Sequence, residues 1–275
     1  MNTRMTRRDR LRRPRRVLAA LLAAGLLGAI ATTGSATAAP TATSAPTPLP
    51  FSTPNTDTCP NKTAPPPPID ESEVPSAGQK PPEPLPIPAK PVGGGKLGGC
   101  GVVLPEGAPP PPADISATAW LVADMDTGKV LAAKDPHGRY RPASTMKTLL
   151  AAVALPALDP NKVVTGTQDD ANADGTRVGV GPGGQYTNDQ LFHALLMCSG
   201  NDAAHAIATQ LGGVDATVAK MNDLAKHLQA LDSRAATPSG LDGPGMSTSA
   251  YDLATIFRHD MQNPAFANIV HTEEF

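Results

Sequence analysis

The chain has 275 residues, a formal net charge of −2 at pH 7 and aromatic side chains at only 3% of positions. The charge is uneven, because residues 1–16 carry eight Arg and one Asp (+7), which leaves about −9 for the remainder (−2 minus +7). A mildly acidic remainder with few aromatic side chains and no basic stripe excludes nucleic acid as the expected partner.

The arginine block runs directly into a short apolar segment, residues 17–31, which small residues with an A-x-A pattern at 36–38 follow. The apolar segment is shorter than the roughly 20 residues needed to cross a bilayer. A charged start, a short apolar run and an A-x-A site predict a secretory signal peptide over residues 1–39, so we expect export to the cell envelope. The export route, general or twin-arginine, and retention as an uncleaved membrane anchor stay open.

Residues 40–113 are dominated by Pro, Thr, Ala, Ser and Gly. The runs of four prolines at 65–68 and 109–112 lack amide donors and fix φ, so they form neither helices nor interior strands. This composition predicts a disordered, extended stalk rather than a domain. Cys59 and Cys100 flank most of it, and whether they pair in an oxidising compartment is not decided by the sequence.

Residues 114–275 have the composition of a globular domain. Residues 119–123 and 129–132 predict two strands joined by a tight turn at 126–128. Helices are expected downstream over 144–155, 187–200, 202–211, a segment carrying residues 218–228, and 248–261. A hairpin followed by consecutive helices predicts a mixed α/β (α+β) domain whose sheet has too few strands.

Two positions in these helices carry further expectations. Thr187 and Gln190 have the spacing of a capping box, which marks a helix start. Cys198 stands in an apolar helical run, so we expect a small buried side chain rather than a nucleophile. No metal site is expected, because zinc-type Cys/His spacing is absent and the calcium-loop-like run from Asp170 has Gly181 where a glutamate is required.

Ser144 and Lys147 have S-x-x-K spacing, which places a hydroxyl and an amine on one face of a helix. Serine is a poor nucleophile until a base takes its proton, and lysine is a base only when it is neutral. That requires a lysine pKa near 7, which burial and the positive end of a helix favour. Alone, this spacing is more typical of surface residues.

A second feature is Ser199-Gly200-Asn201, which lies in the break between two predicted helices. A loop there can present a hydroxyl and a carboxamide to a cleft, and the carboxamide both donates and accepts hydrogen bonds. By itself this triplet is typical of helix capping.

Together the two features resemble the serine penicillin-binding protein and β-lactamase superfamily, whose sites use S-x-x-K, S-x-N and K-T-G. More closely, the chain is similar to the D-alanyl-D-alanine carboxypeptidase family. The similarity extends in order through nearly all of residues 115–270, in the segments 120–124, 127–131, 141–147, 195–204, 221–222, 239–242 and 247–254.

The resemblance implies a β-lactamase/DD-peptidase-like fold with helices on an antiparallel sheet. It makes Ser144 the acyl-enzyme nucleophile and Lys147 the general base. It makes Ser199 a proton relay toward the leaving amine and Asn201 a substrate-orienting group. The implied reaction releases the terminal D-alanine of peptidoglycan stem peptides ending in D-Ala-D-Ala, during cell-wall biosynthesis and the control of cell shape. β-Lactam antibiotics would acylate the same serine, and no metal or organic cofactor is implied.

The third motif is absent, because no Lys, Arg or His followed by Ser or Thr and then Gly occurs between Asn201 and Phe275. In the family this motif helps bind the substrate carboxylate and supplies an oxyanion-hole N–H. Losing one such donor lowers the rate by about 10²–10³-fold. We therefore expect the 114–275 domain to be incomplete, lacking C-terminal strands of a longer enzyme, and unstable or nearly inactive as it stands.

Two other functions stay open. A class A β-lactamase uses a glutamate downstream of S-x-N, whereas no Glu occurs between Asn201 and Glu273, and Gly200 replaces the usual Asp. A non-catalytic envelope-binding protein would keep the cleft without the chemistry. Penicillin labelling that is lost on Ser144→Ala would favour the enzyme over the binding protein.

Overall fold

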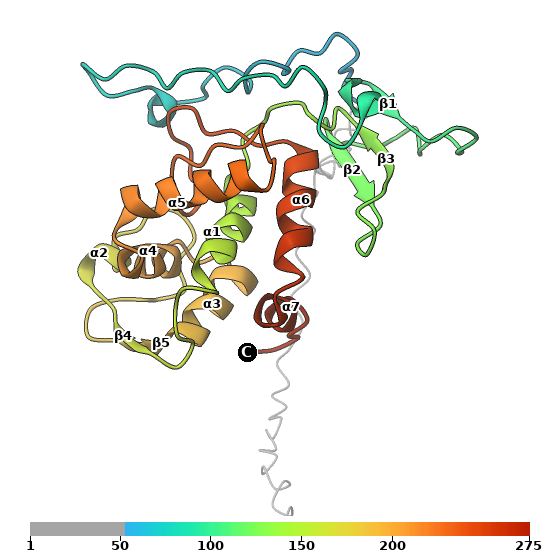
Figure 1. The fold of residues 1–275 in the computed structure, drawn as a ribbon. Helices are drawn as coiled ribbons and strands as arrows, with labels where there is room; N and C mark the ends of the chain where they lie inside the picture. Colours follow the sequence, from blue (N-terminus) through green and yellow to red (C-terminus); the bar gives the residue numbers. More distant parts are fainter. Residues whose placement is uncertain (1–52) are drawn as a thin grey trace, which may run out of the picture. The chain divides into compact units, whose positions relative to one another are not determined.

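The computed structural model describes residues 53–275, so the signal peptide expected over 1–39 lies outside the described residues. No helix of the described part has the length and apolar character needed to span a bilayer. The elements follow one another along the chain (Figure 1) as η1 Glu71–Glu73, η2 Gly95–Gly98, β1 Val102–Val103, β2 Trp120–Ala123, β3 Val130–Lys134, η3 Ala143–Met146, α1 Lys147–Ala154, β4 Val163–Thr165, α2 Gln168–Ala171, β5 Gln185–Thr187, α3 Asn188–Met197, α4 Asn201–Gln210, α5 Val214–His227, α6 Ala250–Asp260 and α7 Pro264–Val270.

The predicted hairpin is confirmed as β2 and β3, which pair antiparallel from Trp120 opposite Lys134 to Ala123 opposite Val130. Gly128 closes the turn with φ of +72°, a backbone conformation that favours glycine. β1 pairs with the other edge of β3, so the strand order is β1-β3-β2. An antiparallel sheet with helices beside it confirms the mixed α+β class.

Helix α6 lies between this sheet and the other helices (Figure 1), and it contacts both β2 and α1. Within the described residues β2 pairs only with β3. A groove of about 890 Å³ runs between β2 and α6 and reaches Thr145 and Thr148. The sheet therefore has few strands, as the sequence predicts, and one side of β2 faces a groove.

The core is built around α1, which contacts α3, α4, α5 and α6. The apolar face of this segment packs into the core, since Leu149 and Leu150 are inaccessible to solvent. The predicted helix over 144–155 differs in its first turn, which is the 3₁₀ turn η3. The amide of Lys147, the residue that follows η3, donates to the Ser144 carbonyl three residues earlier.

The start of α3 confirms the predicted capping box. Thr187 Oγ1 accepts from the Gln190 amide at 3.2 Å, and Gln190 Oε1 accepts from the Thr187 amide at 2.9 Å. The helices α4, α5 and α6 agree with the predicted segments to within a turn. Helices α2 and α7 and the two-stranded β4–β5 sheet were not predicted, because they are short and carry weak periodicity.

The structure differs from the stalk expected over 40–113 in the part that it describes. Residues 53–105, which we call the strap, lie along the folded domain (Figure 1), and β1 of the strap joins the sheet. Leu97 of the strap is buried. Prolines lack an amide donor but keep a carbonyl acceptor, and the domain binds these carbonyls with cationic side chains.

Arg139 makes the largest set of these contacts. Its guanidinium donates to the carbonyls of Thr63 (2.8 Å), Leu85 (2.8 Å) and Pro86 (3.0 Å), and its Nε donates to Asp232 Oδ1 (3.2 Å). The Arg139 side chain is 1% exposed, so this charge is satisfied almost entirely by protein groups. Five donors in a fixed fork suit arginine to such multiple contacts.

His137 supports the same junction. Its Nδ1 lies 2.8 Å from Asp232 Oδ2, and its Nε2 lies 3.1 Å from the Val92 carbonyl oxygen of the strap. A carboxylate and a carbonyl only accept, so both contacts favour the imidazolium form of the ring. Burial opposes this charge, but the hydrogen bond and charge of Asp232 outweigh burial and raise the pKa of His137. His137, Asp232 and Asp252 lie within metal-ligand distance of one another, but both ring nitrogens of His137 already contact hydrogen-bond acceptors, which disfavours cation binding there.

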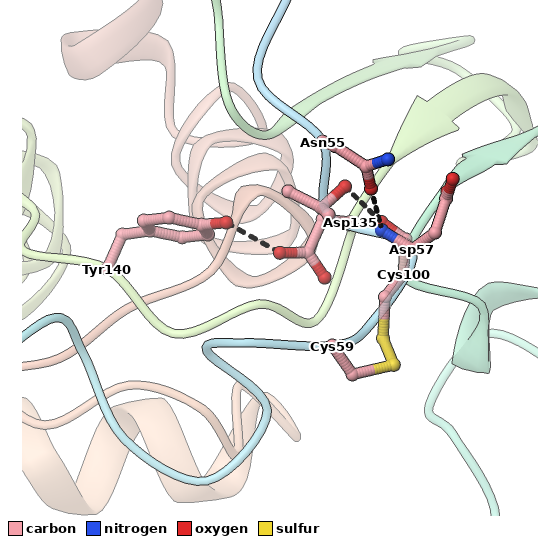
Figure 2. The surroundings of a disulfide bond; sticks show 7 residues. Asn55, Asp57, Cys59, Cys100, Asp135 and Tyr140 are labelled. Carbon is pink, nitrogen blue, oxygen red and sulfur yellow. Dashed lines mark hydrogen bonds between the residues drawn. A yellow bond between two sulfur atoms is a disulfide. The ribbon is translucent and has the colours of Figure 1, made fainter.

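The structure pairs Cys59 with Cys100, which the sequence left undecided. Figure 2 shows the bond near Asp135, whose carboxylate accepts a hydrogen bond from the Tyr140 hydroxyl at 2.6 Å. The bond ties the first part of the strap to Cys100, two residues before β1. The carbonyl of the next residue, Gly101, accepts from the Asp135 amide at 3.2 Å. The strap is thus closed on itself and held to the domain.

Candidate active site

The structure brings the first two predicted site residues together. Lys147 Nζ lies 2.9 Å from Ser144 Oγ, within hydrogen-bond distance. Ser144 belongs to the exposed surface of η3, whereas Lys147, the first residue of α1, is 2% exposed. A serine hydroxyl that opens to solvent beside a buried amine is the geometry of a nucleophile and its base.

The surroundings of Lys147 favour its neutral form. Its Nζ donates to the carbonyl oxygen of Ser239 at 2.8 Å, and within residues 53–275 no carboxylate forms an ion pair with it. Burial lowers the pKa of Lys147 to about 8. A neutral amine that donates one N–H to the Ser239 carbonyl keeps its lone pair for the Ser144 proton.

The backbone before Ser144 explains why its hydroxyl faces outward. Ala143 adopts a left-handed conformation with φ of +46°, which is uncommon for a residue with a side chain. This conformation turns the chain sharply between Pro142 and the start of η3. Met146, which is fully buried, holds the other side of the same turn in the core.

Ser239 is a site residue that the sequence analysis did not assign. The segment 239–242 carries part of the family resemblance, but the contact uses a backbone carbonyl, which leaves no side-chain signature. Gly240 has φ of +85°, and a Cβ there would overlap the Ala143 carbonyl oxygen. A glycine is therefore required where this loop packs against the turn of residues 141–144, the proposed nucleophile turn.

Ser199 and Asn201 lie in the connection between α3 and α4. Ser199 has φ of +58°, and the Gly200 amide donates to the Ala194 carbonyl at 3.0 Å, which ends α3. Asn201 Nδ2 donates to the Asp174 carbonyl at 2.6 Å. Because a carbonyl only accepts, the amide nitrogen faces Asp174. The Asn201 Oδ1 is buried and has no hydrogen-bond partner among the described residues.

The loop of residues 174–180, which contacts Asn201, is held by hydrogen bonds to Asp202. Asp202 is fully buried, and its Oδ2 accepts from the amides of Val178 (2.9 Å), Gly179 (2.8 Å) and Val180 (2.9 Å). A carboxylate with several amide donors fixes the loop that supplies the Asp174 carbonyl. This arrangement orients the Asn201 side chain before any ligand is present.

The predicted site has two parts, Ser144 with Lys147 and Ser199 with Asn201. The structure connects these two parts only through contacts between the helices that carry them. Helices α3 and α4 both contact α1, which carries Lys147. In the described part of the chain, neither Ser199 nor Asn201 forms a hydrogen bond with Ser144 or Lys147. The serine–lysine pair is therefore assembled, while the Ser199 and Asn201 groups stand on neighbouring elements.

Cys198 is a correction to the sequence analysis, which predicted a buried side chain. It is an exposed free cysteine. Helix α3 ends at Met197, so Cys198 is the C-cap residue and leaves the apolar face that the helical periodicity would have continued.

Comparisons with known proteins agree with this geometry. The family model described as D-alanyl-D-alanine carboxypeptidase matches residues 106–274. The carboxypeptidase DacB2 of Mycobacterium tuberculosis is 52% identical over 169 residues, which cover 61% of this chain and 58% of that protein. DacD of Salmonella typhimurium is 39% identical over 164 residues, 55% of this chain and 42% of that protein. The chain thus spans 58% of the length of DacB2 and 42% of the length of DacD.

Solved structures give the same result. The crystal structure of a D-alanyl-D-alanine carboxypeptidase from M. tuberculosis superposes with a TM-score of 0.60 at 50% identity, over 62% of this chain and 65% of that one. A Streptomyces K15 DD-transpeptidase variant superposes with a TM-score of 0.56 at 26% identity, over 58% of this chain and 66% of that one.

Proposed function

Because the chain belongs to the D-alanyl-D-alanine carboxypeptidase family, we propose that it contributes the nucleophile and base of a serine-type peptidase acting on peptidoglycan stem peptides ending in D-Ala-D-Ala. The observation that carries the proposal is the 2.9 Å contact between Ser144 Oγ and a buried Lys147 amine that has no carboxylate partner among the described residues. An amine in this state takes a proton from the hydroxyl that it contacts.

In the first step, Ser144 Oγ attacks the carbonyl carbon of the penultimate D-alanine while the neutral Lys147 amine accepts the hydroxyl proton. The tetrahedral intermediate then collapses, its C–N bond breaks, and the terminal D-alanine leaves with a proton on its nitrogen. Ser199 relays that proton from the Lys147 ammonium. Water then hydrolyses the acyl ester and restores Ser144. Asn201 Oδ1, which has no hydrogen-bond partner among residues 53–275, accepts a hydrogen bond from an N–H of the peptide.

A β-lactam would react in the same first step. Its ring amide would be attacked by Ser144 Oγ, the ring C–N bond would open, and the drug would stay attached as an ester. The site would need no metal or organic cofactor for this chemistry, since a serine, a lysine and hydrogen-bonding groups supply every proton transfer.

Labelling with a fluorescent penicillin tests the proposal in the full-length protein. We expect covalent labelling of the wild type, loss of labelling in Ser144→Ala, and full labelling in Thr209→Ala, which removes an exposed hydroxyl from α4. Release of D-alanine from a D-Ala-D-Ala stem peptide should follow the same order. Stem-peptide binding without labelling would instead identify a non-catalytic envelope-binding protein, and rapid nitrocefin hydrolysis would identify a β-lactamase.

The proposed substrate lies outside the cytoplasm, so the enzyme must be exported. The arginine-rich start, the apolar run of residues 17–31 and the A-x-A pattern support a signal peptide over 1–39. Mass spectrometry of the protein recovered from the cell envelope should find an N-terminus close to Pro40. An N-terminus at Met1 in the membrane fraction would show that the segment is retained as an anchor.

A further inference from the structure

Arg141 stands three residues before Ser144, yet its side chain contacts the strap. Its Nε donates to Glu73 Oε2 at 2.6 Å, and its Nη2 donates to the carbonyls of Pro66 (2.9 Å) and Pro67 (2.6 Å). The two charged side chains are 13% and 9% exposed, so solvent screens the ion pair weakly. An ion pair joins the strap to the residue next to the nucleophile turn.

Glu73 is itself held in place by the strap. Its second oxygen, Oε1, accepts from the Ile69 amide at 3.0 Å. Asp70 caps the adjacent 3₁₀ turn η1, because its Oδ1 accepts from the Ser72 amide at 2.8 Å. The carboxylate that meets Arg141 is therefore fixed by a folded turn and does not rely on a flexible tail.

The other contacts of the nucleophile turn come from the domain. Tyr140 and Thr248 exchange two backbone hydrogen bonds of 2.8 Å, which hold the residue before Arg141. Ala143, in its left-handed conformation, packs against Gly240. Residues 141–143 lie between these two sets of contacts. The Arg141 side chain ties them to the strap through its hydrogen bonds. A strained backbone persists only where its surroundings enforce it.

We propose that Glu73 is a positioning residue for acylation, which acts through Arg141 to hold the Ala143–Ser144 turn in its reactive geometry. This inference rests on the proposed function. It extends the active-site framework into the strap, which lies before residues 106–274 that match the family. Small displacements of a nucleophile slow a reaction steeply, because attack requires a near-optimal distance and angle.

Rapid-mixing kinetics with a fluorescent penicillin tests the inference in the full-length protein, because they separate the acylation rate constant from the affinity of the initial complex. We expect Glu73→Ala to lower the acylation rate constant by about tenfold while the initial dissociation constant changes less than about threefold. Glu73→Gln should recover most of the rate, because its amide oxygen still accepts from Arg141 Nε.

The matched control is Arg234→Gln. Arg234 Nη2 donates to the Glu83 carbonyl at 2.6 Å, so this variant weakens the strap at a place that does not touch Arg141. Its acylation rate constant should stay within about twofold of the wild type. The thermal unfolding midpoint of each variant, measured in parallel, shows whether that variant is folded at the temperature of the kinetic assay.

Three results would overturn the inference. The first is wild-type acylation by Glu73→Ala. The second is equal slowing in Glu73→Ala, Glu73→Gln and Arg234→Gln, which would mean that the strap only stabilises the fold. The third is a wild type that is not labelled at all, which would refute the proposed function together with this inference. The first two leave the proposed function standing, so the failures are distinguishable.

Discussion

Lys147 illustrates how one buried side chain decides the chemistry of a site. An exposed lysine at pH 7 is almost entirely an ammonium, because its ordinary pKa is about 10.4. Burial lowers the pKa of Lys147 to about 8, which leaves roughly a tenth of the molecules with a neutral amine at pH 7. That fraction supports the proposed role of Lys147 as the base for Ser144, whose hydroxyl it contacts directly.

The pH dependence of acylation follows from this value. The active form is the neutral amine, so the acylation rate constant should rise nearly tenfold per pH unit below 8 and level off above it. Stopped-flow measurements of the acylation rate constant between pH 6 and 9.5 cover both this rise and the plateau. Lys147→Arg keeps the positive charge at every accessible pH and should lower the rate by about 10²–10⁴-fold. A wild-type profile that is flat across this range would contradict the role of Lys147.

Gly240 offers a second test at single-residue scale. Gly240→Ala should place a Cβ against the Ala143 carbonyl oxygen and force the Ser239 carbonyl away from Lys147. Gly183 has a similar φ, +78° against +85°, but open space around it. We expect Gly183→Ala to lower the free energy of unfolding by about 1 kcal/mol through backbone strain alone. Gly240→Ala should lower it by about 2–4 kcal/mol and also slow acylation.

Urea unfolding and penicillin acylation of both variants give the two readouts. Equal effects of the two substitutions on stability would show that the loop around residue 240 moves freely. The packing of Gly240 against Ala143 would then have no effect on the acylation rate.

At this scale the sequence predicts pairs that share an element better than pairs that do not. Ser144 and Lys147 are one helical turn apart, so periodicity alone brings their side chains together. The Ser239 carbonyl comes from 92 residues further along the chain. The Glu73 carboxylate comes from 68 residues before its partner Arg141. Neither contact has a local signal, because each depends on how separate segments pack.

Among the elements, helices with side-chain caps and strong apolar stripes agree best with prediction. Thr187 marks the start of α3 because its hydroxyl satisfies an amide that has no partner in the helix. The strap is the largest difference. Its prolines predict an extended chain, and this is correct locally. The regular secondary structure of the strap is limited to two short 3₁₀ turns and a two-residue strand. Its docking depends on Arg139, Arg141 and Arg234, which come later in the chain.

Helix α6 supplies a prediction about stability. Its last residue, Asp260, is buried, and neither carboxylate oxygen has a hydrogen-bond partner among the described residues. Burial raises the pKa of Asp260 to about 8. Between pH 3.8 and 8 the folded chain therefore binds more protons at this site than the unfolded chain does. Linkage then makes the free energy of unfolding fall as pH rises through this window.

Asp260→Asn removes that titration. We expect the variant and the wild type to have similar stability at pH 4, and the variant to be more stable by about 1–3 kcal/mol at pH 8. Urea unfolding at both pH values measures the difference. Asp223→Asn, which changes an exposed carboxylate on α5, should show no such divergence. A constant difference between Asp260→Asn and the wild type at both pH values would contradict the assignment.

For the whole molecule, the Cys59–Cys100 bond is the feature with the clearest energetic consequence. It closes a loop across 41 positions of the strap, which limits the freedom of the unfolded chain. We expect Cys59→Ala/Cys100→Ala to lower the free energy of unfolding by about 2–4 kcal/mol. Thermal unfolding with and without reductant measures this, and limited proteolysis should cut the strap first.

Cys198→Ala is the control, because it removes an exposed thiol and leaves the bond intact. Reductant should destabilise Cys198→Ala and the wild type equally. If the double variant unfolded like the wild type, the bond would make no contribution to holding the strap against the domain.

The strap also imposes an order on biosynthesis. Its anchors connect Val92 to His137, 45 residues later, and Glu83 to Arg234, 151 residues later. The strap is therefore the first of these segments to leave the ribosome, and its partners are made afterwards. Contacts so distant along the chain form slowly. In an oxidising compartment Cys59 and Cys100 can also pair with the third cysteine, Cys198, until the strap docks, so we expect docking of the strap to limit mispaired disulfides.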